Sequence, residues 1–166
     1  MKKIYRVKKK ESLTENIRSV LPEMFDDLMS YSGIVMNYPL RKDDLHEMRK
    51  AGKPLRYTME LGEYCFSAEF KQCLDEIKEA LELMGEIHDA DVIIPELTMH
   101  IKEIRLFNNT LTEKTQRIST RSMRDAVSGL RESRRKMYAE LCAKLGEWIK
   151  NDFRARLIKT MEQTKQ

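Results

Sequence analysis

Apolar side chains recur every three or four residues along most of the chain, the spacing of amphipathic helices. The first such run follows a capping box formed by Ser12 and Glu15 and ends near residues 31–33. Pro22 lies inside this run and predicts a kink, or a restart of the helix after Ser19.

The middle of the chain predicts three further helices. One runs from Asp43 and Asp44, with Glu47 completing its cap, to about Tyr64, and the next begins at Ser67. Residues 85–91 contain Gly85 and two aspartates, and they predict a tight connection before a helix that ends near residues 108–109. We expect that helix to bury Ile93, Leu97, Ile101 and Ile104.

The last third predicts a long helix and a short one. Apolar positions continue from Thr112 to about Gly146, and Asn151 with Asp152 caps a final helix. No segment alternates apolar and polar residues as a strand does, so the predicted fold is an all-α bundle of about five or six helices. We expect one domain over residues 1–166, with residues 1–11 as a flexible basic N-terminus.

Charge is unevenly distributed along the 166 residues, although the net charge is only +4. The net charge is +5 over residues 1–59, −9 over residues 60–104 and +8 over residues 105–166. The three cysteines lack C-x-x-C spacing, and no apolar run is long enough for a membrane span. We therefore expect a cytoplasmic protein with no disulfide framework, no cofactor, no metal and no membrane partner.

The second predicted helix carries a row of cationic and polar side chains on one face. At about 100° per residue they fall within roughly 120° of arc over about 16 Å of helix. Most charge runs are simply solvated faces, but like charges at neighbouring turns repel, and an anionic ligand would relieve that repulsion. The row comprises His46, Arg49, Lys50, Lys53, Arg56 and Tyr57.

The long helix of the last third carries a second basic row. Its members recur with a period near 3.5 residues, and Arg outnumbers Lys, which suits bidentate contacts with phosphate oxygens. We expect these arginines to flank the apolar side of the helix and to line a groove or cavity. The row comprises Arg117, Arg121, Arg124, Ser128, Arg131, Arg135 and Tyr138.

The segment Leu45–Leu61 resembles the signature helix of the CHAD domain, the conserved histidine α-helical domain. The family pattern His-x-x-Arg-(Lys/Arg)-x-x-(Lys/Arg)-x-x-Arg-Tyr is present from His46 to Tyr57. Residues 5–17 and 83–92 add further matches, and residues 130–138 resemble the basic long helix of such domains. The resemblance covers most of the chain.

This resemblance implies a non-catalytic module that binds inorganic polyphosphate through a basic central cavity. It implies ligand contacts from His46, Arg49, Lys50, Lys53, Arg56 and Tyr57, and further contacts from Arg131, Arg134, Arg135 and Tyr138. Family members usually carry two such repeats, whereas this chain has one, and Pro54 replaces a common basic or polar residue. We therefore expect two chains to pair about a twofold axis as a homodimer.

Two other functions use similar residues. Sequence-independent binding of RNA or DNA is the second choice, because counterion release from any phosphate backbone uses Lys and Arg. The chain has few aromatic residues for base stacking and no recognisable nucleic-acid-binding motif. A metal-dependent phosphohydrolase is the remaining alternative, on the basis of His88 and Asp89, but no other ligands with metal-binding spacing accompany them.

Overall fold

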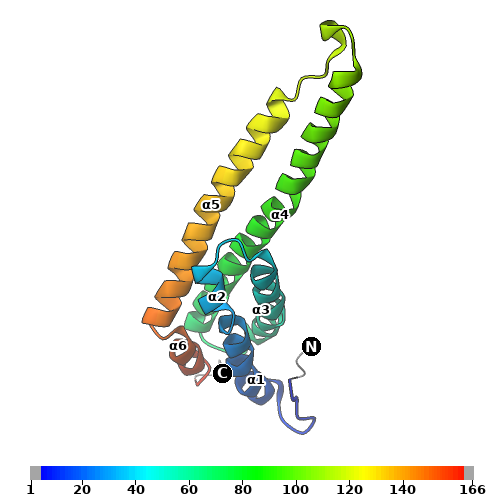
Figure 1. The fold of residues 1–166 in the computed structure, drawn as a ribbon. Helices are drawn as coiled ribbons and strands as arrows, with labels where there is room; N and C mark the ends of the chain where they lie inside the picture. Colours follow the sequence, from blue (N-terminus) through cyan, green and yellow to red (C-terminus); the bar gives the residue numbers. More distant parts are fainter. Residues whose placement is uncertain (1–4, 163–166) are drawn as a thin grey trace.

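The computed structural model describes residues 5–162, and every regular element in that range is helical, as predicted. The two long helices are α4 (Ala68–Thr110) and α5 (Arg121–Lys150). Four shorter helices pack around their adjoining halves and form the body of the molecule with them: α1 (Leu13–Met29), α2 (Ser32–Asn37), α3 (Lys42–Gly62) and α6 (Phe153–Thr160). The other halves of α4 and α5 continue beyond this body as a two-helix hairpin, residues 92–133, which we call the arm (Figure 1). No helix within residues 5–162 combines the length and the apolar character needed to cross a bilayer.

Aromatic rings and a close helix contact hold the body together. Phe25 stacks on Phe153 with ring centroids 5.1 Å apart, and Trp148 packs against both rings. A Cβ atom on Gly52 would collide with Leu81 Cδ2, so the absence of a side chain lets α3 approach α4 closely.

α1 does not restart after Ser19, because one continuous helix includes Pro22. The capping box of Ser12 and Glu15 is present as predicted. Proline inside a helix costs about 3 kcal/mol. That cost is offset by core residues on both sides of the proline, since each fully buried side chain contributes about 1.5–3 kcal/mol. Those residues include Ile17, Val20, Leu21, Phe25 and Leu28.

The start of α3 also differs from the prediction. The helix begins at Lys42, its N-cap is Arg41, and no side chain caps it. Glu47 instead accepts a hydrogen bond from Lys50 at 2.8 Å. The two aspartates remain in the first turn, where the positive end of the helix dipole favours carboxylates.

The predicted connection at residues 85–91 is wrong, because α4 is one continuous helix of 43 residues. Gly85 does not break the helix; it makes room for the guanidinium of Arg49, whose Nη2 would lie 3.3 Å from a Cβ at that position. Asp91 does not cap a new helix either. It is buried, and Arg134 and Lys42 pair with its carboxylate at 2.7 Å and 3.2 Å.

The two long helices therefore differ in extent from the prediction. α4, in the middle of the chain, is the longest helix, and α5 begins at Arg121 rather than after Thr112. Residues 111–120 form the connection at the tip of the arm and include a short 3-10 helix, η1 (Lys114–Gln116). The Asn108 side chain ties this connection to α4, since it accepts from Ile118 N–H and donates to Ile118 C=O.

Within the arm, α4 and α5 share a single apolar seam. Ile101 and Val127 are 7% and 6% exposed and lie between the helices. Of the four residues predicted to be buried in this helix, Ile101 is buried and Leu97 and Ile104 are half-buried, whereas Ile93 is 40% exposed. At the end of α5, Asp152 caps α6 by accepting from Ala155 N–H, as predicted.

Candidate anion-binding site

The basic row of α3 lies along one edge of its contact with α4. Leu45, Met48, Gly52 and Leu55 are buried. The predicted cationic positions directly follow them, and each is half-buried. Because adjacent residues lie about 100° apart on a helix, this offset places the row beside the core and not opposite to it. The half-buried members are His46, Arg49, Lys53 and Arg56, whereas Lys50 and Tyr57 are more exposed.

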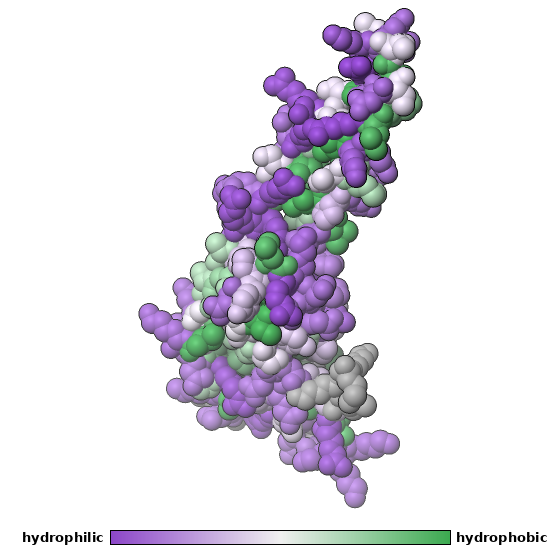
Figure 2. Space-filling view, in the orientation of Figure 1, coloured by the Kyte–Doolittle hydropathy of each residue, from purple (hydrophilic) through white to green (hydrophobic). Residues whose placement is uncertain are grey.

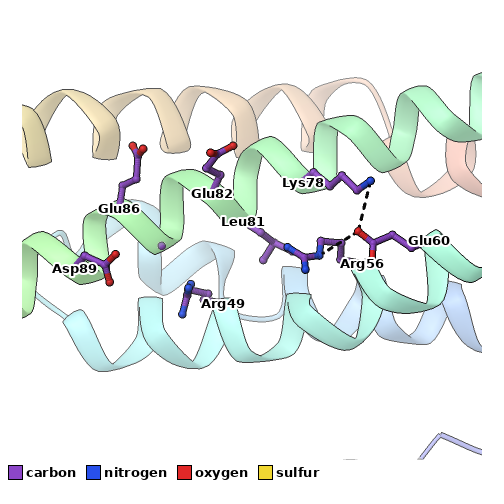
Figure 3. A pocket seen from close by; sticks show the side chains of 9 residues that line it. Arg49, Arg56, Glu60, Lys78, Leu81, Glu82, Glu86 and Asp89 are labelled. Carbon is purple, nitrogen blue, oxygen red and sulfur yellow. Dashed lines mark ion pairs between the residues drawn. The ribbon is translucent and has the colours of Figure 1, made fainter.

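A groove of about 560 Å³ separates this edge of α3 from α4 (Figure 3). Three cations line it: Arg49 and Arg56 from α3, and Lys78 from α4. Four carboxylates also line it, those of Glu60, Glu82, Glu86 and Asp89. The groove of one chain is therefore a site of mixed charge, with the acidic wall formed mainly by α4.

Arg49 is the cation in this groove that is most available to a ligand. Its guanidinium lies over Gly85, and no ion pair is found for it among residues 5–162. Glu82 and Glu86 project from α4 on the side away from Arg49 (Figure 3). A half-buried guanidinium without a carboxylate partner retains its donors for an anion.

Glu60 closes one end of the groove. Its carboxylate lies 3.5 Å from Arg56 Nε and 3.5 Å from Lys78 Nζ, so it bridges the two helices (Figure 3). The Arg56 guanidinium also lies over the Tyr57 ring, 4.7 Å from its centroid. An anion entering this end would therefore compete with Glu60 for the same two cations.

The histidine of the row contacts a second histidine. The rings of His46 and His88 have centroids 4.6 Å apart and are tilted by 30°. Nδ1 of His46 is buried and has no hydrogen-bond partner within the described part of the chain. The sequence placed His88 in a turn, but the continuous α4 places it on a helix that faces α3.

The second basic row lies mainly on the arm and not in this groove, and Arg135 and Tyr138 follow on the part of α5 within the body. Arg121, Arg124, Arg131 and Arg135 are exposed along α5, whereas Arg117 precedes the helix. Apart from Arg135, which pairs with Glu132 at 3.1 Å, no ion pair is found for these arginines among residues 5–162. Of the predicted site residues, the structure therefore brings only Arg49 and Arg56 together in the groove.

Arg134 and Tyr138 hold the base of the arm. Arg134 donates to both carboxylate oxygens of Asp91, at 2.7 Å and 3.0 Å, and to Pro39 C=O at 3.0 Å. The Tyr138 hydroxyl donates to Val35 C=O. Burial disfavours the phenolate and raises the pKa of Tyr138 to about 12. Both side chains are thus committed to contacts within the chain.

Sequence reasoning missed Lys78 and the acidic wall. A signal for the wall was present, since Asp75, Glu82, Asp89, Glu96 and Glu103 follow one another at seven-residue spacing. That spacing became informative only when residues 68–110 proved to be one helix, because seven residues are close to two turns. No group of three or more His, Cys, Asp or Glu side chains within residues 5–162 is placed to hold a metal ion.

The fold and the groove define an all-α module with a row of cations at an interhelical edge. The family model for the CHAD domain matches residues 9–98, more than half of the chain, and the chain therefore belongs to the CHAD domain family. This match includes the whole basic row of α3 and every residue that lines the groove. No curated protein and no solved structure matches the chain.

Proposed function

We propose that this protein binds inorganic polyphosphate through the basic row of α3, without chemical conversion of the ligand. The observation that carries the proposal is Arg49, a half-buried cation without an ion pair among residues 5–162, set in the row that matches the family signature. The row extends over about 16 Å, so a linear anion can meet several of its cations at once.

Binding is electrostatic in this proposal. Lys and Arg replace the counterions along the phosphate chain, and each contact is a charge-assisted hydrogen bond. The exposed arginines of α5 are a second set of candidate contacts. The free cysteines Cys65, Cys73 and Cys142 fit the reducing cytoplasm, where we place the protein.

The test removes three cations from α3. We expect Arg49→Ala/Lys53→Ala/Arg56→Ala to bind long-chain polyphosphate at least about tenfold more weakly, a loss of about 1.4 kcal/mol. The slope of log affinity against log salt should fall by about two to three, since each lost phosphate contact lowers it by about 0.7–0.9. Isothermal titration at several salt concentrations measures both quantities.

A matched control removes the same charge elsewhere. Lys8→Ala/Lys9→Ala/Lys10→Ala also loses three cations, from the N-terminal segment, and should retain nearly the wild-type affinity. If both triple variants lost the same affinity for polyphosphate, the loss would reflect net charge and not the position of the cations on α3. Circular dichroism of both variants checks that the helices persist.

A competition experiment separates polyphosphate from nucleic acid as the ligand. At equal phosphate concentration and fixed salt, we expect RNA and DNA to displace polyphosphate poorly. Efficient displacement by either one would favour the nucleic-acid function instead. Release of orthophosphate during incubation with polyphosphate would contradict the non-catalytic part of the proposal.

A further inference from the structure

The two ion pairs at the closed end of the groove are longer than hydrogen-bonded pairs. One oxygen of Glu60, Oε1, lies 3.5 Å from Arg56 Nε of α3 and 3.5 Å from Lys78 Nζ of α4. Charge-assisted hydrogen bonds join atoms about 2.7–2.9 Å apart, and Lys144 and Glu79 form such a contact between α5 and α4 at 2.8 Å. Glu60 therefore neutralises two cations without binding either one closely.

The Arg56 guanidinium retains a donor without an acceptor. Its Nε is buried and has no hydrogen-bond partner among residues 5–162. Buried N–H groups almost always have such a partner, because an unpaired one costs the free energy of its lost hydration. An oxygen closer to Nε than the Glu60 carboxylate would satisfy this donor. The geometry thus indicates an acceptor that residues 5–162 do not supply.

Glu60 is held only weakly in this position. The side chains of Glu60, Arg56 and Lys78 are each 35–38% exposed, and ion pairs at such partly exposed positions contribute little to stability. The three side chains meet between α3 and α4, along the groove from Arg49 (Figure 3). If the Glu60 carboxylate left this position, two cations from different helices would face the same space.

We propose that Arg56 and Lys78 form a phosphate subsite, which the Glu60 carboxylate occupies in the empty groove and leaves when a linear polyanion binds. Oxygens of one phosphate group then accept from Arg56 Nε and from Lys78 Nζ, while Glu60 turns to solvent. Phosphate can bind both cations at hydrogen-bond distance, which the Glu60 carboxylate does not do. This inference rests on the proposed polyphosphate function and adds Lys78, a residue of α4, to the ligand contacts.

The position of Arg49 makes this exchange depend on the length of the ligand. Arg49 lies seven residues before Arg56, about 10 Å along α3, and it has no ion pair among residues 5–162. A chain held at Arg49 brings its next phosphates to Glu60 at a high effective concentration. Orthophosphate has no second group and must displace Glu60 directly from solution. The subsite therefore favours a linear polyanion that spans at least about 10 Å.

The lining of the groove favours an inorganic chain over an organic polyanion. Exposed apolar side chains are visible among polar ones along the arm (Figure 2). In the groove, by contrast, Leu81 is the one large apolar side chain among the described residues that line it. The bases of a nucleic acid would find few partners there, whereas a chain made of phosphate groups alone needs only the cations.

Glu60→Gln tests whether the carboxylate competes with the ligand. The variant keeps the size of the side chain and loses its charge, so we expect long-chain polyphosphate to bind about three- to tenfold more tightly, as the loss of two partly exposed ion pairs allows. Glu82→Gln is the matched control, because Glu82 lines the same groove but forms no ion pair with any residue between 5 and 162. It should change the affinity less than about twofold. An equal gain in both variants would overturn the exchange, since only the total charge of the groove would then matter.

A double-mutant cycle tests whether Lys78 belongs to the subsite. In the wild type, Lys78→Ala removes a ligand contact but also an ion pair that the ligand must break, so we expect affinity to fall only about two- to threefold. In the Glu60→Gln background no ion pair offsets the contact, and the same change should cost about tenfold. Equal losses in the two backgrounds would contradict the exchange. Lys144→Ala, which removes a lysine paired with Glu79 outside the groove, should leave the affinity unchanged in both backgrounds.

The failure of the exchange and the failure of the proposed function give different results. A wild type that binds long-chain polyphosphate, with no gain from Glu60→Gln, would support the function and refute the exchange. The Arg56 Nε–H resonance, titrated with pyrophosphate, reports on the subsite without a long chain, and we expect a larger response in Glu60→Gln than in the wild type. That response in a protein that binds no long-chain polyphosphate would support the subsite and refute the proposed function, whereas equal responses would refute the subsite.

Discussion

At the scale of single residues, glycines decide how closely the cations approach α4. Gly52 admits Leu81, and Gly85 admits the Arg49 guanidinium. Both glycines have buried positions on helices, where Gly costs about 1 kcal/mol relative to Ala by intrinsic propensity. Each position therefore exchanges helix propensity for a tertiary contact, and the contact at Gly85 is one that orients a candidate ligand residue.

We predict that Gly85→Ala separates stability from binding. The added Cβ would lie 3.3 Å from Arg49 Nη2, so the flexible guanidinium must move by a few tenths of an ångström. We expect unfolding stability to rise by up to about 1 kcal/mol from helix propensity, while polyphosphate affinity falls several-fold. Urea denaturation and titration measure the two effects.

Gly129→Ala is the matched control on α5. Nothing lies within 4 Å of a Cβ at Gly129, so this change should raise stability without altering affinity. An affinity loss of the same size in both variants would show that the position of Arg49 is not the cause.

A tyrosine at the base of the arm predicts a dependence on alkaline pH. The pKa of Tyr138 is raised to about 12 in the folded protein, above its ordinary value of 10.0. The folded state thus favours the protonated hydroxyl, whose contribution to stability is complete below pH 10 and is lost as the pH rises from 10 to about 12. Denaturation of wild type and Tyr138→Phe across this range should show a shallower decline for the variant.

At the scale of elements, the continuity of α4 is the feature that organises the molecule. Gly85 and the aspartates near it are typical of a connection between helices, and local propensity alone favours that reading. The helix continues because Arg134 and Lys42 neutralise Asp91 and because the α3 and α5 contacts bury its neighbours. The arm, and with it the separation of the two basic rows, follows from that continuity.

We predict that Asp91→Asn loosens the arm from the body. The change leaves the half-buried Arg134 guanidinium without its carboxylate, and breaking such a buried pair costs about 3–5 kcal/mol at most. We expect a lower free energy of unfolding and faster amide exchange where α2, α4 and α5 meet. Asp89→Asn, an exposed neighbour without an ion pair among the described residues, is the control and should change neither quantity.

At the scale of the whole molecule, charge is segregated by surface. The acidic third of the sequence supplies one wall of the groove, and the basic last third supplies the tip and the arginine row of the arm. A single groove lined by three cations and four carboxylates is poorly suited to hold a polyanion alone. The proposed binding therefore relies on the unpaired Arg49 together with cations of the α3 row that lie outside the groove, such as Lys53.

The ligand's length provides a prediction at this scale. A longer phosphate chain meets more cations along the basic row of α3. Affinity per phosphate should therefore rise from orthophosphate through short oligomers to long chains, and the salt dependence should steepen with it. Equal affinity per phosphate for all lengths would contradict binding along an extended row.

Sequence alone determined the helical fold class, the caps of α1 and α6, and the placement of the basic residues of α3 on one face of that helix. These features are local, because caps and amphipathic faces depend on residues within one or two turns of each other. The family signature added the expected ligand class through residues 46–57, all within a single helix.

Only the tertiary structure decided whether residues 85–91 break a helix, where Asp91 goes, and which cations share a groove. Each answer depends on a partner far away in the sequence: Arg49 for Gly85, Arg134 for Asp91, and Lys78 for Glu60. Periodicity carries no information about such partners, because it describes the face that a residue occupies and not what meets that face. The two basic rows were therefore predictable one by one, and their separation was not.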